Sequence, residues 1–324
     1  MAADAASQPD RACPAWRMGH GRSLTLDSPR IMAILNATPD SFYATSRAME
    51  NDAIDAARRA VLEGADILDI GGESTRPGAT RVDEDEQIAR VVPVIASVRR
   101  DPDPRVASIP ISVDTTRARV ALAAIDAGAD AINDVSAGAE DGAMLALAAE
   151  RGVGLVLMHR ALPPERDQYS DAYAHAPMSG DIAAEVARFL LARARAAIDA
   201  GVRTDAIVLD PGLGFGKTVG QNMELVARTR ELVGLGFPVL SALSRKSFIA
   251  RAIDPDRPPP PEGRLWGTLG ASVTHLLLGA SIFRVHDVKA HREALDAAHR
   301  VRRGAEGGPS GEERVGSASG NAGA

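Results

Sequence analysis

Eight short apolar runs recur along the 324-residue chain, and this repetition limits the folds that it can adopt. Each run has the length of a strand and is too short for a helix that spans a domain. Ala-rich stretches with apolar residues three and four apart separate the runs and predict amphipathic helices. The runs are Ile31–Leu35, Ile67–Ile70, Ile109–Val113, Ala131–Ile132, Val153–Met158, Ala206–Leu209, Val239–Leu243 and Ser281–Val285.

The clearest helical stretches cover residues 51–63, 84–99, 116–127 and 181–200. A glycine follows several predicted helices, where a left-handed residue ends the helix without a Cβ clash. These glycines are Gly64, Gly128, Gly152 and Gly201. Strand and helix are therefore expected to alternate eight times.

Alternation of this kind predicts an α/β fold. Helical crossovers force parallel pairing, and strands buried on both faces are continuously apolar, so the sheet can close into a (β/α)8 TIM barrel. An open doubly wound sheet is the alternative, although it needs no eighth repeat and binds ligand at one crevice. Nearly every run ends in polar residues, which favours a barrel with its site at the carboxyl ends of the strands.

The chain length suits one barrel of about 250 residues with extensions at both ends. We expect an irregular N-terminal extension over residues 1–25, the barrel over 26–302, and a disordered tail over 303–324, where apolar residues are few. The long irregular region after the fifth run, 160–180, is either a lid or a solvated insertion, and its role stays open.

Bulk properties exclude several classes of partner. A net charge of −6 and an aromatic content of 3% argue against a nucleic-acid surface. No apolar run approaches the roughly 20 residues that cross a bilayer, so no membrane contact is expected. The N-terminus lacks the features of a signal peptide, and Cys13 is the single cysteine. These features predict a cytoplasmic protein.

Two loops at the predicted rim carry polar groups. The first strand ends at Asn36, whose neutral oxygen suits Mg²⁺ or a phosphate hydrogen bond, although it is more often a turn residue. After the second strand, the loop Gly71–Gly78 combines glycines, hydroxyls and charges. In that loop Glu73 and Arg76 could simply pair with each other.

Three further strands end in Asp or Asn, namely at Asp114, Asn133 and Asp210. Such groups in one barrel mouth are costly to desolvate without a partner rich in N–H donors, such as a pterin or a purine-like ring. Alternatively, Asp114 and Asp210 are N-caps of the helices that follow.

The last three βα loops favour an anion site. The segment from Asp210 to Thr218 misses the phosphate-binding P-loop pattern because Pro211 stands at its first glycine, and Phe215 is available to flank a flat ligand. Lys246, Arg284 and His286 place cations beside the helix that Ser247 opens, where barrels usually bind phosphate. His159 is interpreted as structural.

Seven segments, in this order, resemble the dihydropteroate synthase family from about Ile31 to about Asp296: LNATPDSF, DIGGESTRPG, SVDT, IND, DPGLGFGK, SRKSF and RVHDV. The resemblance implies the condensation of 6-hydroxymethyl-7,8-dihydropterin diphosphate with p-aminobenzoate in folate synthesis. It also implies Mg²⁺ as cofactor, sulfonamides as competitors, and a homodimer.

The resemblance also implies a role for each matching residue. Asn36 binds Mg²⁺ and diphosphate, and Arg284 and His286 hold the β-phosphate. Four residues recognise the pterin: Asp114, Asn133, Asp210 and Lys246. Five shape the p-aminobenzoate side: Thr75, Arg76, Pro77, Phe215 and Ser247. Thr75 also contacts the pterin diphosphate, and Asp114, Lys246, Arg284 and His286 form the expected catalytic set.

The chain departs from the family pattern in the loop Tyr43–Arg47, which leaves its effect on p-aminobenzoate binding open, and at Arg160–Leu162. Two other functions are considered. A pterin-dependent methyltransferase domain has no use for Lys246 or the Arg284 and His286 pair, and a catalytically silent pterin-binding paralogue would keep the ligand groups without turnover. Oligomeric state, sulfonamide sensitivity and the role of the tail are not decided by the sequence.

Overall fold

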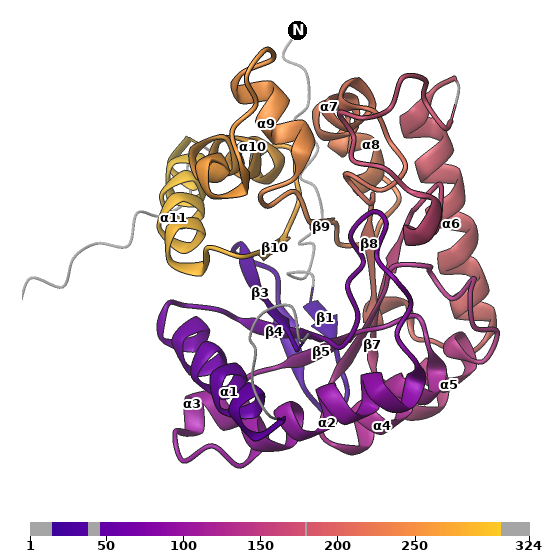
Figure 1. Ribbon diagram of the computed structural model, residues 1–324, viewed down its shortest axis with the longest axis vertical. Helices are drawn as coiled ribbons and strands as arrows, with labels where there is room; N and C mark the ends of the chain where they lie inside the picture. The colour runs from indigo at the N-terminus through magenta and orange to yellow at the C-terminus, as the bar shows by residue number, and fades with distance from the viewer. Residues whose placement is uncertain (1–14, 38–45, 179, 306–324) are drawn as a thin grey trace, which may run out of the picture.

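The computed structural model describes residues 15–37, 46–178 and 180–305, with side chains from residue 52 onward in the first helix. Eight parallel strands form a ring that helices surround (Figure 1). The (β/α)8 barrel predicted from the sequence is confirmed. In the described part of the chain, no helix is long and apolar enough to span a membrane.

The barrel strands follow one another around the ring in chain order, β3 to β10. Their bounds are Arg30–Asn36 (β3), Ile67–Gly71 (β4), Ile111–Asp114 (β5), Ala131–Asp134 (β6), Gly154–Met158 (β7), Ile207–Asp210 (β8), Leu240–Ser241 (β9) and Ile282–Val285 (β10). The ring closes where β10 pairs with β3 and where Leu209 in β8 bridges Val239 beside β9.

The helices between the strands match the predicted stretches closely. The main ones are Ser46–Leu62 (α1), Glu84–Arg99 (α2), Ala118–Asp126 (α4), Met144–Arg151 (α5), Ile182–Asp199 (α6), Val219–Ala227 (α7), Leu265–Leu277 (α10) and Val288–Ala305 (α11). Shorter helices are Pro104–Ser108 (α3), Thr229–Val233 (α8) and Ser247–Ile253 (α9). All four glycines expected after helices have positive φ, from 61° to 117°.

The helix N-caps are not the strand-end carboxylates. The side chains of Asp83, Asp181 and Thr218 cap α2, α6 and α7, and Arg117 precedes α4 without a side-chain cap bond. The alternative that Asp114 and Asp210 serve as N-caps is therefore wrong. Both carboxylates remain available at the barrel mouth.

Part of the predicted N-terminal extension is ordered, which corrects the boundary at residue 25. Ala15–Arg17 (β1) and Ser23–Thr25 (β2) form an antiparallel hairpin. Trp16 is fully buried, and its indole Nε1 donates to the carbonyl of Ala206 at 2.9 Å. The ring packs so closely on Gly154 that a Cβ there would lie 2.9 Å from Nε1, so glycine is needed.

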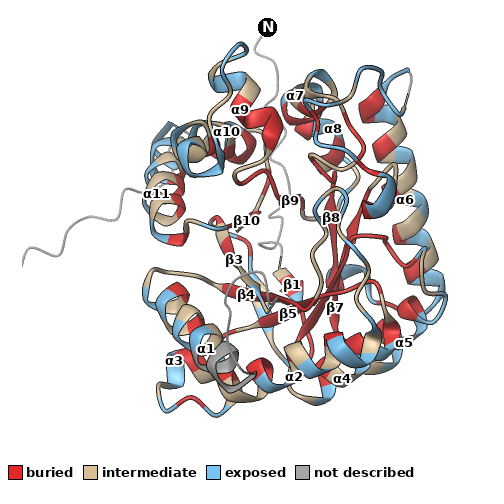
Figure 2. Ribbon diagram, in the orientation of Figure 1, coloured by how far each residue is buried: buried red, intermediate tan, exposed pale blue. Residues whose placement is uncertain are grey.

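The hairpin closes the N-terminal end of the barrel. Trp16 and Met18 share an apolar cluster with residues at or near the start of barrel strands, including Met32, Ile67 and Ile282. A larger apolar layer lies between the strands and the surrounding helices, and the strands are almost entirely buried (Figure 2). Only the carboxyl ends of the strands are left to form a site. The tail predicted from residue 303 is helical through Ala305, and the rest of it lies outside the described residues.

Candidate active site

The center of the barrel mouth is a chain of buried charges around Arg284, at the end of β10. The guanidinium donates from Nε to Asp69 at 2.6 Å and from Nη2 to Asp114 at 2.7 Å. Asp69 also accepts from the amide of Asn133 at 3.0 Å and from the hydroxyl of Ser112. The hydrogen-bond network around the guanidinium of Arg284 therefore joins four strands, β4, β5, β6 and β10.

These charges perturb one another. Burial disfavours the cation of Arg284, but Asp69 and Asp114 outweigh burial and raise its pKa above the usual range. Burial raises the pKa of Asp114 above its ordinary value, and Arg284 opposes this rise. Oδ2 of Asp114 accepts a hydrogen bond from Arg284, whereas its buried Oδ1 has no hydrogen-bond partner among the described residues. A buried acceptor without a partner favours a ligand that donates an N–H.

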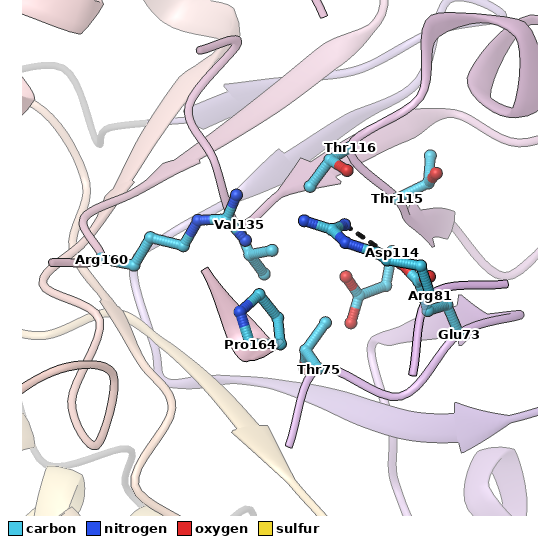
Figure 3. A pocket seen from close by; sticks show the side chains of 9 residues that line it. All are labelled: Glu73, Thr75, Arg81, Asp114, Thr115, Thr116, Val135, Arg160 and Pro164. Atoms are coloured by element: carbon cyan, nitrogen blue, oxygen red, sulfur yellow. Dashed lines mark hydrogen bonds and ion pairs between the residues drawn. The ribbon is translucent and has the colours of Figure 1, made fainter. Parts of the chain in front are cut away.

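Asp114 also lines a small cavity with Thr75, which lies in the loop after β4 (Figure 3). The cavity has a volume of about 10 Å³, enough for one water molecule. Arg81 and Arg160 reach its wall from opposite sides, and both pair with Glu140. Glu73 accepts from the backbone N–H of Val82 at 2.7 Å and lies 3.5 Å from Arg81, so the suggested pairing of Glu73 with Arg76 is wrong.

Asp210, which is buried, and Lys246, which is half-buried, supply a second pair of charges. Burial raises the pKa of Asp210, which Lys246 opposes, and burial lowers the pKa of Lys246 to about 7 against the attraction of Asp210. The ammonium of Lys246 donates to the carbonyl of Leu213 and lies 4.2 Å from the ring center of Phe215. The structure therefore brings together Asp210, Phe215 and Lys246, as the sequence predicts.

Lys217 stabilises the glycine loop after β8. It is fully buried and was not among the site residues predicted from the sequence. Its ammonium donates to the carbonyls of Gly212 at 2.8 Å, Phe215 at 3.0 Å and His159 at 3.3 Å. A Cβ at Gly212, where φ is 66°, would lie 1.7 Å from the carbonyl of His159. Close packing explains why this loop is rich in glycine.

The rarity of lysine in the sequence was the signal that could have identified Lys217. The chain has three lysines; Lys217 is fully buried and Lys246 is half-buried, and both lie at the glycine loop. Burial lowers the pKa of Lys217 to about 7, against the attraction of Asp210. Asp69 is the other omission from the predicted site, although its place at the end of the second apolar run was apparent.

His286 and Ser247 complete the rim near Arg284. The imidazole Nδ1 of His286 lies 3.1 Å from the hydroxyl of Ser244. The residue is exposed at the rim, but partial desolvation of its ring, followed by Arg284 and Arg245, lowers its pKa below the ordinary value. A neutral imidazole at pH 7 can still donate one hydrogen bond to a phosphate. Ser247 opens α9 and is buried.

The remaining predicted residues lie at the edge of the mouth. Asn36 ends β3, in register with Gly71, and its side chain is exposed. Arg76 is exposed and Pro77 is half-buried. In the described part of the chain, neither residue has a recorded contact with the buried charges. His159 is buried with its ring edge-on to Phe189, at 4.9 Å between centers, which fits a structural role. The divergent loop Tyr43–Arg47 lies outside the residues whose side chains are described.

Asn36 fits a magnesium ion that substrate phosphates hold in large part. Mg²⁺ commonly takes one or two protein oxygens together with phosphate and water. The exposed amide of Asn36 offers one neutral oxygen at the rim. Residues 15–37, 46–178 and 180–305 contain no group of three His, Cys, Asp or Glu that could hold a metal without substrate.

Comparison with known proteins agrees with this geometry. The profile of the pterin-binding enzymes matches residues 32–286. A dihydropteroate synthase of Synechocystis is 42% identical over 261 residues, which is 80% of this chain and 86% of that protein. The same enzyme from Xanthomonas albilineans, solved with 4-aminobenzoic acid, is 40% identical with a TM-score of 0.78, over 90% of this chain and 99% of that one.

A third match extends the set of ligands. The Yersinia pestis dihydropteroate synthase in complex with a sulfonamide drug is 36% identical, with a TM-score of 0.78, over 88% of this chain and 98% of that one. The family profile and the high identity over most of the chain decide the assignment. The chain belongs to the pterin-binding enzyme family, among its dihydropteroate synthases.

Proposed function

We propose that the buried charges at the barrel mouth bind a dihydropterin diphosphate and that the rim binds p-aminobenzoate. The enzyme condenses 6-hydroxymethyl-7,8-dihydropterin diphosphate with p-aminobenzoate to 7,8-dihydropteroate and diphosphate. The observation that carries the site assignment is the carboxylate of Asp114, with one oxygen on Arg284 and a buried oxygen without a partner. The N–H groups of a pterin are the donors that such an oxygen needs.

The other buried groups suit the same ring. Asp210 accepts from the N–H of Gly212 at 2.7 Å and has Lys246 as its counter-charge. Asn133, held by Asp69, presents an amide beside Asp114 on the neighbouring strand. A ring with alternating donors and acceptors satisfies this set, whereas a purely apolar ligand leaves it desolvated and unpaired.

The leaving group lies toward Arg284 and His286 in this proposal. Nε and Nη2 of Arg284 are engaged with carboxylates, so Nη1 is the nitrogen available to phosphate. His286 adds a neutral donor. Asn36 would hold Mg²⁺, and the ion would supply charge neutralisation for the leaving diphosphate.

Bond cleavage comes first in the proposed order. The bond between the pterin methylene and diphosphate breaks, and the diphosphate takes the electron pair. The positive charge on the methylene is stabilised by the electrostatic field of Asp114. The amine nitrogen of p-aminobenzoate then forms the new C–N bond and loses one proton. No side-chain nucleophile is needed in this substitution, which resembles SN1.

Turnover by the purified protein tests this proposal. With the pterin diphosphate and Mg²⁺, we expect dihydropteroate and diphosphate to form in equal amounts when p-aminobenzoate is present. A sulfonamide should compete with p-aminobenzoate, and a chelator should suppress turnover. Binding of the pterin without any turnover would instead identify a silent pterin-binding paralogue.

We also propose a homodimer that covers an apolar stripe on α10 and α11. Trp266 is 80% exposed, and Leu277, about three turns further along α10, is 46% exposed. Val301 on the adjacent α11 is 74% exposed. Exposed large apolar side chains on neighbouring helices, including an aromatic one, are typical of protein interfaces.

Sedimentation should give about twice the chain mass of 33.9 kDa for the wild type. Trp266→Glu places a charge in the stripe, and we expect it to shift the protein toward the monomer. Leu122→Glu, at a partly exposed position on α4, is the matched control and should remain dimeric. A monomeric wild type, or an unaffected Trp266→Glu dimer, would rule out this interface. Cytoplasmic location stays a prediction from the sequence.

A further inference from the structure

The segment after β7, residues 160–173, crosses the barrel mouth and joins loops from opposite sides of the ring. On one side the carbonyl of Pro164 accepts from the N–H of Gly78 at 2.8 Å, and Glu165 pairs with Arg81. Both partners belong to the loop after β4. On the other side the segment contacts the loops after β8 and β9. Because β4 and β8 are four strands apart in an eight-stranded ring, this crossing segment spans the site.

Asp167 attaches the crossing segment to the glycine loop. Its buried carboxylate accepts from the N–H of Gly216 with both oxygens at 3.1 Å. It also accepts from the N–H of Gln168 at 2.7 Å and from the hydroxyl of Tyr173 at 2.5 Å. Gly216 directly follows Phe215, whose ring faces the ammonium of Lys246. Asp167 therefore fixes the peptide that carries Phe215.

Ser170 attaches the crossing segment to Ser247. The backbone N–H of Ser170 donates to the hydroxyl oxygen of Ser247 at 3.1 Å. Ser170 is itself fixed, because its own hydroxyl accepts from the amide of Asn222 at 3.0 Å. A hydroxyl that already accepts a hydrogen bond keeps its hydrogen free to donate. Among the described residues no acceptor for that hydrogen is recorded, so Ser247 is prepared to donate to a ligand.

We propose that Asp167 and Ser170 are positioning residues that set the preference of the enzyme for an aromatic amine bearing a carboxylate. A carboxylate offers only acceptors, which matches the donor that Ser170 prepares on Ser247. Phe215, held in place through Asp167 and Gly216, flanks the ring of the same substrate. This inference rests on the proposed placement of p-aminobenzoate beside Phe215 and Ser247.

The test compares two amine substrates of similar shape, p-aminobenzoate and the neutral 4-aminobenzamide. For each enzyme variant, kcat/KM is measured for both amines at a saturating concentration of the pterin diphosphate. Asp167→Ala detaches the crossing segment that carries Ser170 from the glycine loop, so we expect it to lower the selectivity for p-aminobenzoate over the amide by about tenfold, the effect of losing roughly the one charge-assisted hydrogen bond from Ser247. The KM for the pterin diphosphate should change far less.

Three further variants separate positioning from general damage. Asp167→Asn keeps one acceptor for Gly216 and should retain most of the selectivity. Ser170→Ala loses only the bond from Asn222 and should reduce the selectivity to a smaller extent, which keeps the test informative if Asp167→Ala does not fold. Asp171→Ala removes an exposed carboxylate of the same segment, whose recorded partner is Arg251 at 3.7 Å, and should behave as wild type.

The outcomes also distinguish the two proposals. A wild-type protein that forms no dihydropteroate would contradict the proposed function itself. An active wild type in which Asp167→Ala and Ser170→Ala reduce kcat/KM equally for both amines, or raise mainly the KM for the pterin diphosphate, would overturn the positioning role alone.

Discussion

Replacement of Lys246 by Ala should lower kcat/KM for dihydropteroate formation by about 100-fold or more, because a charged partner of the ligand is removed from the barrel mouth. Lys246 is the cation beside Asp210, and its ammonium lies against Phe215. Without Lys246, Asp210 loses the cation that most favours its charged form, and only the weaker attractions of Arg284 and Lys217 remain. The free carboxylate would then take up a proton or repel the leaving diphosphate. The loss should appear in the KM for the pterin diphosphate as well as in kcat.

The third lysine of the chain provides a matched control. Lys289 lies on α11 with an exposed side chain and a weak contact to Glu293 at 4.0 Å. Lys289→Ala should leave both kinetic constants unchanged. If Lys246→Ala retains wild-type turnover, Lys246 cannot contribute to ligand binding as proposed.

The pH dependence of ligand affinity gives a second check on Lys246. Its pKa is lowered by burial to about 7, so the free enzyme loses this positive charge as the pH rises through 7. An anionic diphosphate favours the protonated lysine, so affinity should fall above pH 7 by up to about tenfold per pH unit. Lys246→Met lacks this titration. Equal pH dependence of the Kd in the two proteins would show that the titration belongs to another group.

Much of the barrel could be predicted because its strands are buried on both faces and therefore continuously apolar. Boundaries were less certain. The third run was expected to begin at Ile109, but β5 begins at Ile111, since Ile109 is the C-cap of α3 and Pro110 has no N–H for a strand ladder. The hairpin before residue 26 was missed because strands of three residues show no periodicity.

Site residues that lie at or just after the ends of strands could be predicted from the sequence. Those whose role depends on contacts distant in sequence could not. Asp114 and Asp210 were found because each directly follows an apolar run, and Lys246 because it lies three residues after one. The role of Asp167 depends on Gly216, which is 49 residues away, and neither residue belongs to a periodic element. Similarly, Glu73 has Arg81 within its own loop, and only the course of the backbone decides between Arg81 and Arg76.

Replacement of Arg284 by Ala should have the largest combined effect on activity and stability. Arg284 neutralises two buried carboxylates, Asp69 with no exposed surface and Asp114 with 6%. Removal of one partner from a buried ion pair typically costs about 3–5 kcal/mol of unfolding free energy. It also removes the proposed contact to the diphosphate, so turnover should fall below detection. Urea unfolding and the turnover assay measure the two effects.

Acid pH should partly restore the stability of Arg284→Ala, and the sign follows from the carboxylates. Arg284 is the first interaction that lowers the pKa of Asp114 against burial, so its loss raises that pKa further. Between the unfolded value near 4 and the raised folded value, the folded state then binds more protons than the unfolded state, and stability falls as pH rises. The deficit relative to wild type should therefore be smallest near pH 5 and largest above pH 8. Arg251→Ala serves as the control, because the recorded ion pair of Arg251, with Asp171, is long at 3.7 Å. It should show neither the deficit nor its pH dependence. A deficit in Arg284→Ala that stays constant from pH 5 to pH 8 would mean that Asp114 is not the titrating group that Arg284 compensates.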